Sequence, residues 1–134
     1  MERENYKSIF KKTLVDFLDS LIEILPSEPN LIVARIHIND KVESDSLINY
    51  FIFSFMDPNK PYKEAVEKHN EKPFLEAEKD KENGKSIFGN LPDEIVSHFK
   101  YLWRSNSISN DNKRIIWKWL SSLVKIVERY QECK

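Results

Sequence analysis

Few side chains in this sequence have the types and spacing that catalysis or metal binding requires. Glu94 and His98 are four residues apart, so a helix would place both on one face, where they could share a metal ion. A single pair of this kind is more typical of a surface hydrogen bond. Asp93 and Glu94 stand at an expected helix start, where carboxylates interact with the helix dipole rather than form an acid–base pair. We therefore predict no metal site.

The other candidates for chemistry are isolated from one another. His37 lies between two isoleucines, which indicates a partly buried histidine rather than a catalyst. Cys133 has no histidine near it in the sequence that would activate it as a nucleophile. The motifs GxGxxG, GxxxxGK[ST], HExxH and CxxC are absent. We predict no catalytic residue, no cofactor and no enzyme activity; the alternative is a pocket that holds His37, His69 or His98 beside a carboxylate.

Length and composition favour a single all-α domain. A chain of 134 residues can bury one hydrophobic core, and two glycines are too few for the turns of a β-sandwich, a barrel or a phosphate-binding α/β fold. The charged start Met1–Glu4 does not resemble a signal peptide, and no run of about eighteen apolar residues is present to span a bilayer. A single cysteine, Cys133, fits a reducing compartment.

The most strongly patterned stretch, residues 110–131, predicts a closing helix against which the others pack. Its apolar residues recur at three- and four-residue spacing and form a stripe broad enough for neighbours on more than one side. Ser109 is the expected N-cap. The alternatives to a core helix are a membrane-surface helix or a helix bound in a partner's groove. The bulky anchors of such a groove-bound helix would be Trp117, Val124 and Tyr130.

The rest of the chain predicts a bundle of about five helices around this closing helix. Residues 5–25 carry a clean apolar stripe that ends at Pro26, and residues 45–56 are apolar nearly all round, which predicts the central, most buried helix. Residues 31–38, LIVARIHI, fit either a strand or a helix. We interpret them as a short buried helix, because a lone strand would lack a partner. The remaining predictions are helices at 62–69 and 92–104 and a charged, mobile loop at 70–90.

Charge is distributed unevenly along the chain. Residues 13–57 contain eight acidic and two basic side chains, a net charge of −6, whereas residues 98–134 contain eight basic and three acidic ones, a net charge of +5. Such segments could attract each other within the fold or face different partners. We interpret the row Asp16, Asp19 and Glu23 as a surface in water. The residues that we predict to bind a partner are the exposed bases Lys113, Arg114, Lys118 and Lys125.

Two stretches suggest a family context. The first is Lys12–Ile22, which continues to Pro26, and the second is Ser109–Leu123, with a serine cap followed by a tryptophan-bearing helix. In their order, separated by a variable charged middle, they resemble small uncharacterised helical proteins encoded by nucleocytoplasmic large DNA viruses (giant viruses). The resemblance implies a viral protein of the host cytoplasm or the virion, and it supplies no catalytic residues.

Together these features favour a non-enzymatic helical protein-interaction module, either a minor virion component or a host-interaction factor. Its expected partners are viral structural or host proteins, and a homo-oligomer is compatible with this function. The alternative is weak nucleic-acid binding by the basic C-terminal third, with an affinity that falls steeply as salt is added. The bases are few and are interleaved with apolar residues, so nucleic acid is the less favoured partner.

Overall fold

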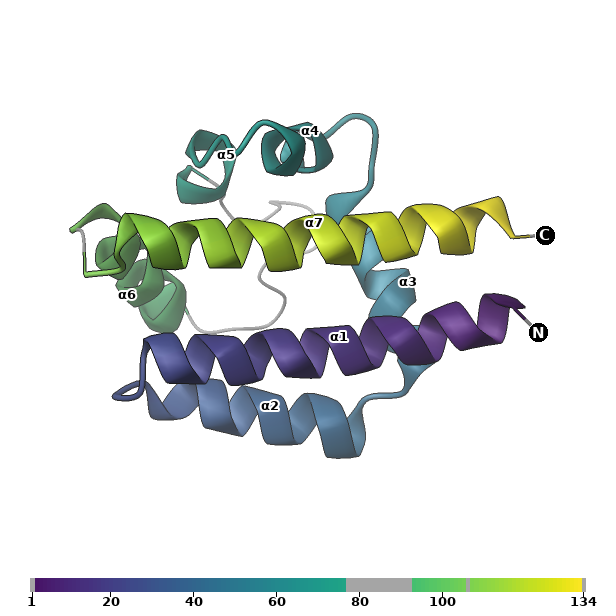
Figure 1. Ribbon diagram of the computed structural model, residues 1–134, viewed down its shortest axis with the longest axis horizontal. Coiled ribbons are helices and arrows are strands. Elements are labelled where there is room, and N and C mark those ends of the chain that lie inside the picture. The colour runs from purple at the N-terminus through teal and green to yellow at the C-terminus, as the bar shows by residue number, and fades with distance from the viewer. Residues whose placement is uncertain (1, 77–92, 106, 134) are drawn as a thin grey trace.

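All regular structure in the part of the chain that the structure describes, residues 2–76, 93–105 and 107–133 of this computed structural model, is helical. The first and last helices, α1 (Glu2–Ile24) and α7 (Asn110–Glu132), lie antiparallel and side by side at the centre (Figure 1). Helix α2 (Pro29–Lys41) packs against α1 on the side away from α7, and α3 (Ser44–Phe55) crosses behind both near the chain ends.

Three further helices complete the bundle. Helices α4 (Tyr62–Glu67) and α5 (Lys72–Leu75) cover the other side of α7, and α6 (Asp93–Arg104) lies behind its start. The all-α prediction is therefore confirmed. The described residues form seven helices, and two of them are short helices in the charged middle. Helix α4 matches the helix predicted at 62–69, whereas α5 was not predicted. One of these, α5, replaces the first part of the loop predicted at 70–90, while residues 77–90 lie outside the described residues.

The wide apolar stripe of α7 is buried on two sides, which confirms its interpretation as a core helix. On one side Leu123 and Val127 join Phe10 of α1 in the main core cluster. On the other side Trp117 and Val124 join Phe55 and Val66 in a second cluster. The anchors expected of a groove-bound helix are therefore already used within the fold: Trp117, Val124 and Tyr130 are only 6, 3 and 3% exposed.

The start of α7 is fixed as the sequence predicts. The Ser109 hydroxyl accepts a hydrogen bond from the backbone N–H of Asn112, at 3.1 Å. Asp111 adds a carboxylate at the positive end of the helix dipole. These interactions fix the residue at which α7 begins. The direction of each later side chain on α7 then follows from helical geometry.

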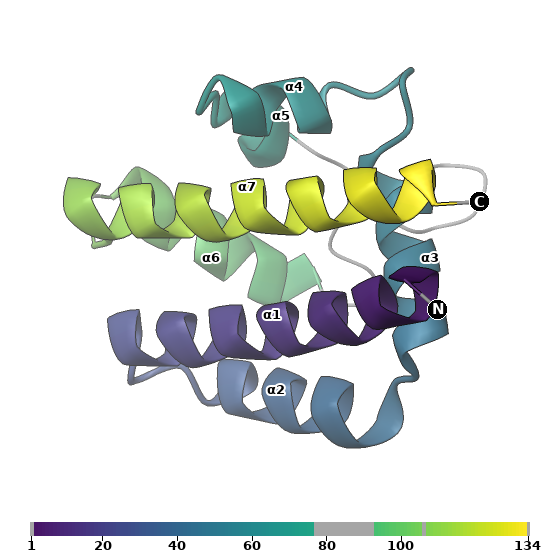
Figure 2. The same ribbon diagram turned by 45° about the vertical axis from the view of Figure 1, so that its right-hand side comes forward.

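The prediction that residues 31–38 form a buried helix is half right. They lie within α2, but Leu31 is the only buried side chain of that helix. His37, expected to be partly buried, is exposed. The physical reason is that α2 packs against α1 along one side and has no described neighbour on the other (Figure 2). The apolar run therefore buries one side of α2 and leaves apolar side chains on its other side exposed to solvent.

Helix α3 is not the most buried helix, contrary to expectation. It buries Ile48, Ser54 and Phe55, but Phe53 remains 60% exposed, with the Lys60 ammonium 5.6 Å from its ring centre. Helix α7 contributes more buried side chains. The reason is geometric, because α3 lies at the periphery, whereas α7 lies between α1 and the α4–α5 pair.

Just after α4 lies the one non-glycine residue with positive φ among the described residues, His69 at φ 53°. The backbone N–H of His69 donates to the Val66 carbonyl at 3.2 Å, and that of Asn70 donates to the Ala65 carbonyl at 2.8 Å. This is the Schellman pattern, in which glycine usually takes the left-handed position. The His69 ring stacks on Trp117 with ring centres 5.3 Å apart and planes 6° apart, which offsets the backbone strain.

Two substitutions at His69 are expected to distinguish the cost of its left-handed backbone from the contribution of its ring contact with Trp117 to the free energy of unfolding. His69→Ala keeps the left-handed strain and loses the ring contact, so the free energy of unfolding should fall by about 1 kcal/mol. His69→Gly loses the same contact but relieves the strain, so we expect a smaller loss. Urea unfolding of both variants would measure the difference. An alanine variant as stable as the glycine variant would contradict a strained backbone at this position.

Candidate functional site

Three of the four bases predicted to bind a partner share one exposed face of α7. At 100° per residue, Arg114, Lys118 and Lys125 fall on one side of the helix, and Arg129 continues the same row. All four are exposed. We call these four residues the basic face of α7. Arg129 is four residues beyond Lys125, and this spacing was the signal that could have added it to the predicted set.

Lys113 lies apart from that row. It is half-buried, and its ammonium nitrogen lies 4.9 Å from the centre of the Trp103 ring on α6. Such a cation–π contact favours a fixed position for the side chain. In this structure Lys113 therefore connects α7 to α6, while the other three predicted bases face outward.

Most of the charge on the basic face has no ion-pair partner among the described residues. An Arg114 guanidinium nitrogen lies 3.0 Å from an Asp111 carboxylate oxygen, but both side chains are well exposed and such a pair contributes little to stability. The side chains of Lys118, Lys125 and Arg129 make no hydrogen bond or ion pair with any residue in the described part of the chain. The cationic groups of these three side chains are therefore available to a partner.

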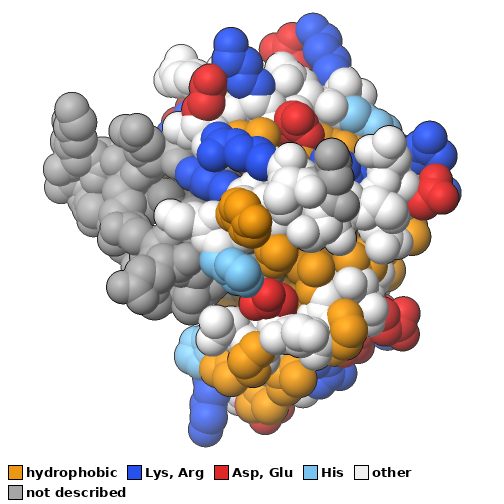
Figure 3. All heavy atoms as spheres, turned by 90° about the vertical axis from the view of Figure 1, so that its left-hand side faces the viewer, with side chains coloured by type: hydrophobic (Ala, Val, Ile, Leu, Met, Phe, Trp, Pro, Cys, Tyr) orange, Lys and Arg blue, Asp and Glu red, His pale blue; other side chains and the backbone are white. Residues whose placement is uncertain are grey.

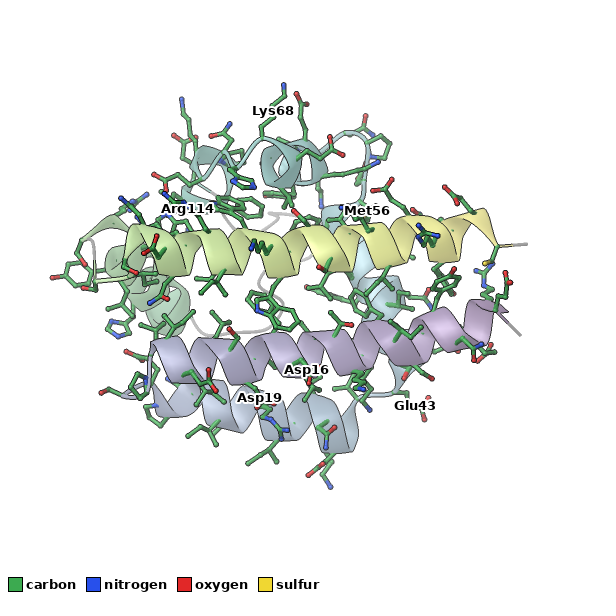
Figure 4. The ribbon with its side chains drawn as sticks, viewed as in Figure 1. Asp16, Asp19, Glu43, Met56, Lys68 and Arg114 are labelled. Carbon is green, nitrogen blue, oxygen red and sulfur yellow. The ribbon has the colours of Figure 1, made fainter. Side chains whose placement is uncertain are left out.

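The acidic segment of the chain does not neutralise this face. Asp19 on α1 pairs with Arg35 on α2, and hydrogen bonding to Asp19 raises the pKa of Arg35. Asp45 pairs with Lys7, and hydrogen bonds to Asp45 and then Glu4 raise the pKa of Lys7. Figure 4 shows Arg114 on α7, away from Asp19, which lies beside α2. The Asp19 carboxylate and the basic face of α7 thus lie in different parts of the fold.

The histidines that could have formed an active site lie on α2, just after α4 and on α6, and they have different surroundings. His37 is exposed on α2, His69 stacks on Trp117, and the His98 Nε2 atom lies 2.8 Å from a carboxylate oxygen of Glu28. The predicted hydrogen-bond partner of His98, Glu94, has a side chain outside the described residues, as does Asp93. No group of three or more His, Cys, Asp or Glu side chains with metal-binding geometry occurs among the residues described.

A second exposed surface, on α2, was missed by sequence reasoning. Its outer side carries Ile32, Val33 and Ile36, which are 44, 64 and 51% exposed. Figure 3 shows hydrophobic side chains gathered at the lower edge of the molecule, over α2. The signal was present in the spacing of these residues, but it was interpreted as a core face.

Among the described helices, none is both long enough and apolar enough to cross a membrane. Neither the protein-family models, nor the curated proteins, nor the solved structures with which the chain was compared contain a match to it.

Proposed function

We propose that this protein is a non-enzymatic helical protein-interaction module that binds an acidic surface of another protein through the basic face of α7. The observation that carries this proposal is that the side chains of Lys118, Lys125 and Arg129 are exposed and make no ion pair with any described residue, on a helix whose opposite side is buried. Charged groups in such a position attract an oppositely charged partner and set its orientation.

The helix presents these charges on a fixed backbone. Helix α7 is capped by Ser109 and packed between α1 and α4. Residues 114–129 span about 22 Å at 1.5 Å per residue. Because the backbone is already ordered, a partner has to immobilise only the ends of four long side chains, which lowers the entropic cost of binding. The matching partner is an acidic helix or strand edge of similar length.

A protein partner fits the density of charge better than a nucleic acid does. Duplex DNA carries one phosphate charge per ~1.7 Å of its axis, so about 22 Å presents roughly thirteen charges. The basic face offers four cations, of which Arg114 already pairs with Asp111. Glu128 and Glu132 also belong to α7 and would repel phosphates nearby. Widely spaced carboxylates are a closer match to this face.

The biological setting of the proposal comes from the sequence resemblance. In that setting the module is a minor virion component or a host-interaction factor of a large DNA virus, acting in the host cytoplasm or in the particle. Amine cross-linking in infected cells or purified particles, followed by mass spectrometry, would identify its neighbours. Links from Lys118 or Lys125 to one or two other proteins are the expected result, and the absence of such links from α7 would overturn the proposal.

Charge reversal on the basic face is expected to weaken binding to the cross-linked partner. The double variant Lys118→Glu and Lys125→Glu should lower the affinity by about tenfold or more, because attraction becomes repulsion. The matched control reverses two other exposed lysines, Lys41 on α2 and Lys72 on α5, with the same change in net charge. Both variants should keep the circular dichroism of the parent.

Two results of that experiment would count against the proposal. Equal loss of binding in the control variant would indicate a general effect of net charge and not a site on α7. Binding to single- or double-stranded DNA or RNA, abolished by the α7 variant and falling steeply with salt, would identify a nucleic acid as the partner instead.

A further inference from the structure

The outer side of α2 has an organised pattern. Pro29, Val33, Ile36 and Asp40 are all exposed and follow one another at spacings of four, three and four residues. On a helix, this spacing makes a single straight stripe, with the geometry of the a and d positions of a coiled coil. We call these four residues the α2 seam. Ile32 lies beside the seam and widens its apolar part.

The seam cannot be buried by rotation of α2 within its own chain. The inner side of the helix is held to α1 by buried Leu31 and by the Arg35–Asp19 ion pair. Just beyond the helix, the Lys11 ammonium donates to the Val42 carbonyl at 2.6 Å. An apolar stripe held in an outward orientation is typical of a surface that another molecule covers.

The residues of the seam are spaced by four, three and four positions, an order that is the same from either end of α2. This symmetry indicates that a second copy of the chain covers the seam. In an antiparallel pair of α2 helices related by a two-fold axis, Val33 of each copy lies against Ile36 of the other. Pro29 of each copy then lies opposite Asp40 of the other. A parallel pair would instead place the two Asp40 carboxylates against each other, which is unfavourable. The seam therefore complements itself in the antiparallel arrangement.

Charge at the ends of the seam supports the same arrangement. The first turn of α2 has no side-chain cap: Glu28 occupies the N-cap position, but its carboxylate lies 2.8 Å from His98 Nε2. In the antiparallel pair, Asp40 of the second copy comes to this uncapped positive end of the helix dipole. The two-fold axis repeats the interaction at the other end, so both termini of the seam gain a favourable contact.

From these observations we infer that the α2 seam is a self-association surface that forms an antiparallel, two-fold symmetric homodimer. The inference is independent of the proposed function, because it uses α2 and not α7. A helix of 13 residues is about 20 Å long, and its pairing buries less than the ~800 Å² per partner of a standard interface. We therefore expect weak association, with a dissociation constant on the order of 100 µM.

Sedimentation equilibrium of the full chain between about 10 µM and 1 mM tests this inference, a range that brackets the expected constant. The average mass should rise toward that of a dimer, and Ile36→Glu should keep the protein monomeric throughout. The matched control is Ile9→Glu, since Ile9 is also 45% exposed but lies on the far side of α1, about 200° from Lys11. The inference would be overturned if the unsubstituted protein stayed monomeric at 1 mM. It would also be overturned if Ile9→Glu prevented dimer formation as strongly as Ile36→Glu.

Disulfide trapping tests the direction of the pair. In a Cys133→Ser background, chains that carry Val33→Cys are mixed with chains that carry Ile36→Cys and are oxidised. Antiparallel pairing predicts mainly disulfides between the two kinds of chain. Disulfides that form mainly between identical chains would indicate parallel pairing and would overturn the proposed arrangement.

Discussion

Replacement of Phe10 by alanine is expected to lower the free energy of unfolding by about 4 kcal/mol, within the range for large aromatic-to-alanine changes in cores. Phe10 is fully buried at the centre of the main core cluster, and its ring meets Phe51 edge-on with centres 5.1 Å apart. Its removal leaves a cavity between α1, α3 and α7 that these packed helices cannot close without distortion. A small domain is stabilised by only about 5–15 kcal/mol, so this loss is severe.

Urea unfolding followed by circular dichroism would measure the loss, with Phe53→Ala as the matched control. Phe53 is 60% exposed on α3, so the same chemical change should alter the free energy of unfolding by no more than about 0.5 kcal/mol. Equal effects of the two variants would show that the burial pattern described for α3 is wrong.

Replacement of Trp117 by alanine is expected to cost about 3–5 kcal/mol and to loosen one side of the bundle first. Among the described residues, Trp117 contacts the rings of His69 after α4, Phe74 of α5 and Trp103 of α6, with ring centres 5.3, 5.9 and 5.8 Å apart. These contacts connect three short elements to α7. Without the indole, the α4–α5 segment loses much of its apolar attachment, because a four-residue helix such as α5 is not stable alone.

Limited proteolysis combined with urea unfolding tests this expectation. Cleavage within residues 58–76 should become faster in Trp117→Ala while α1 stays protected. The comparison variant is Trp119→Ala, since Trp119 stacks on Phe17 of α1 and not on the α4–α5 side. Should Trp119→Ala expose residues 58–76 to the same degree, Trp117 would not have the specific role assigned to it.

The sequence was sufficient to predict six of the seven described helices, but not how many neighbouring elements pack against each helix. The spacing in residues 110–131 predicts a broad buried face, and α7 has one. The equally apolar residues 31–38 and 45–56 predict burial, yet Val33 and Phe53 are exposed. Periodicity records which side chains share a face, whereas burial depends on whether another element reaches that face, which is a property of the tertiary arrangement.

The candidate site shows the same limit at the level of single side chains. Arg114, Lys118 and Lys125 face outward together, as helical spacing allows. Helical spacing alone places Lys113 about 100° from Arg114, outside their row, but its contact with Trp103 depends on how α6 approaches α7 and was not predictable from sequence. Arg129 shares their face but is not among the bases predicted to bind a partner. Sequence reasoning thus found the helix and most of the charges, but not which cations remain unpaired.

The pairing of the first and last helices has a consequence for how the chain folds during synthesis. Phe10 and Phe17 of α1 share their core cluster with Leu123 and Val127 of α7, across more than a hundred residues of sequence. A ribosome makes α1 first, so these aromatic rings stay without their native neighbours until α7 has emerged. Closing so long a loop also costs entropy before any core contact compensates for it, which slows folding relative to bundles built from local contacts. Until α7 is complete, the nascent chain is therefore exposed to aggregation or to chaperone binding through these unpaired aromatic rings of α1.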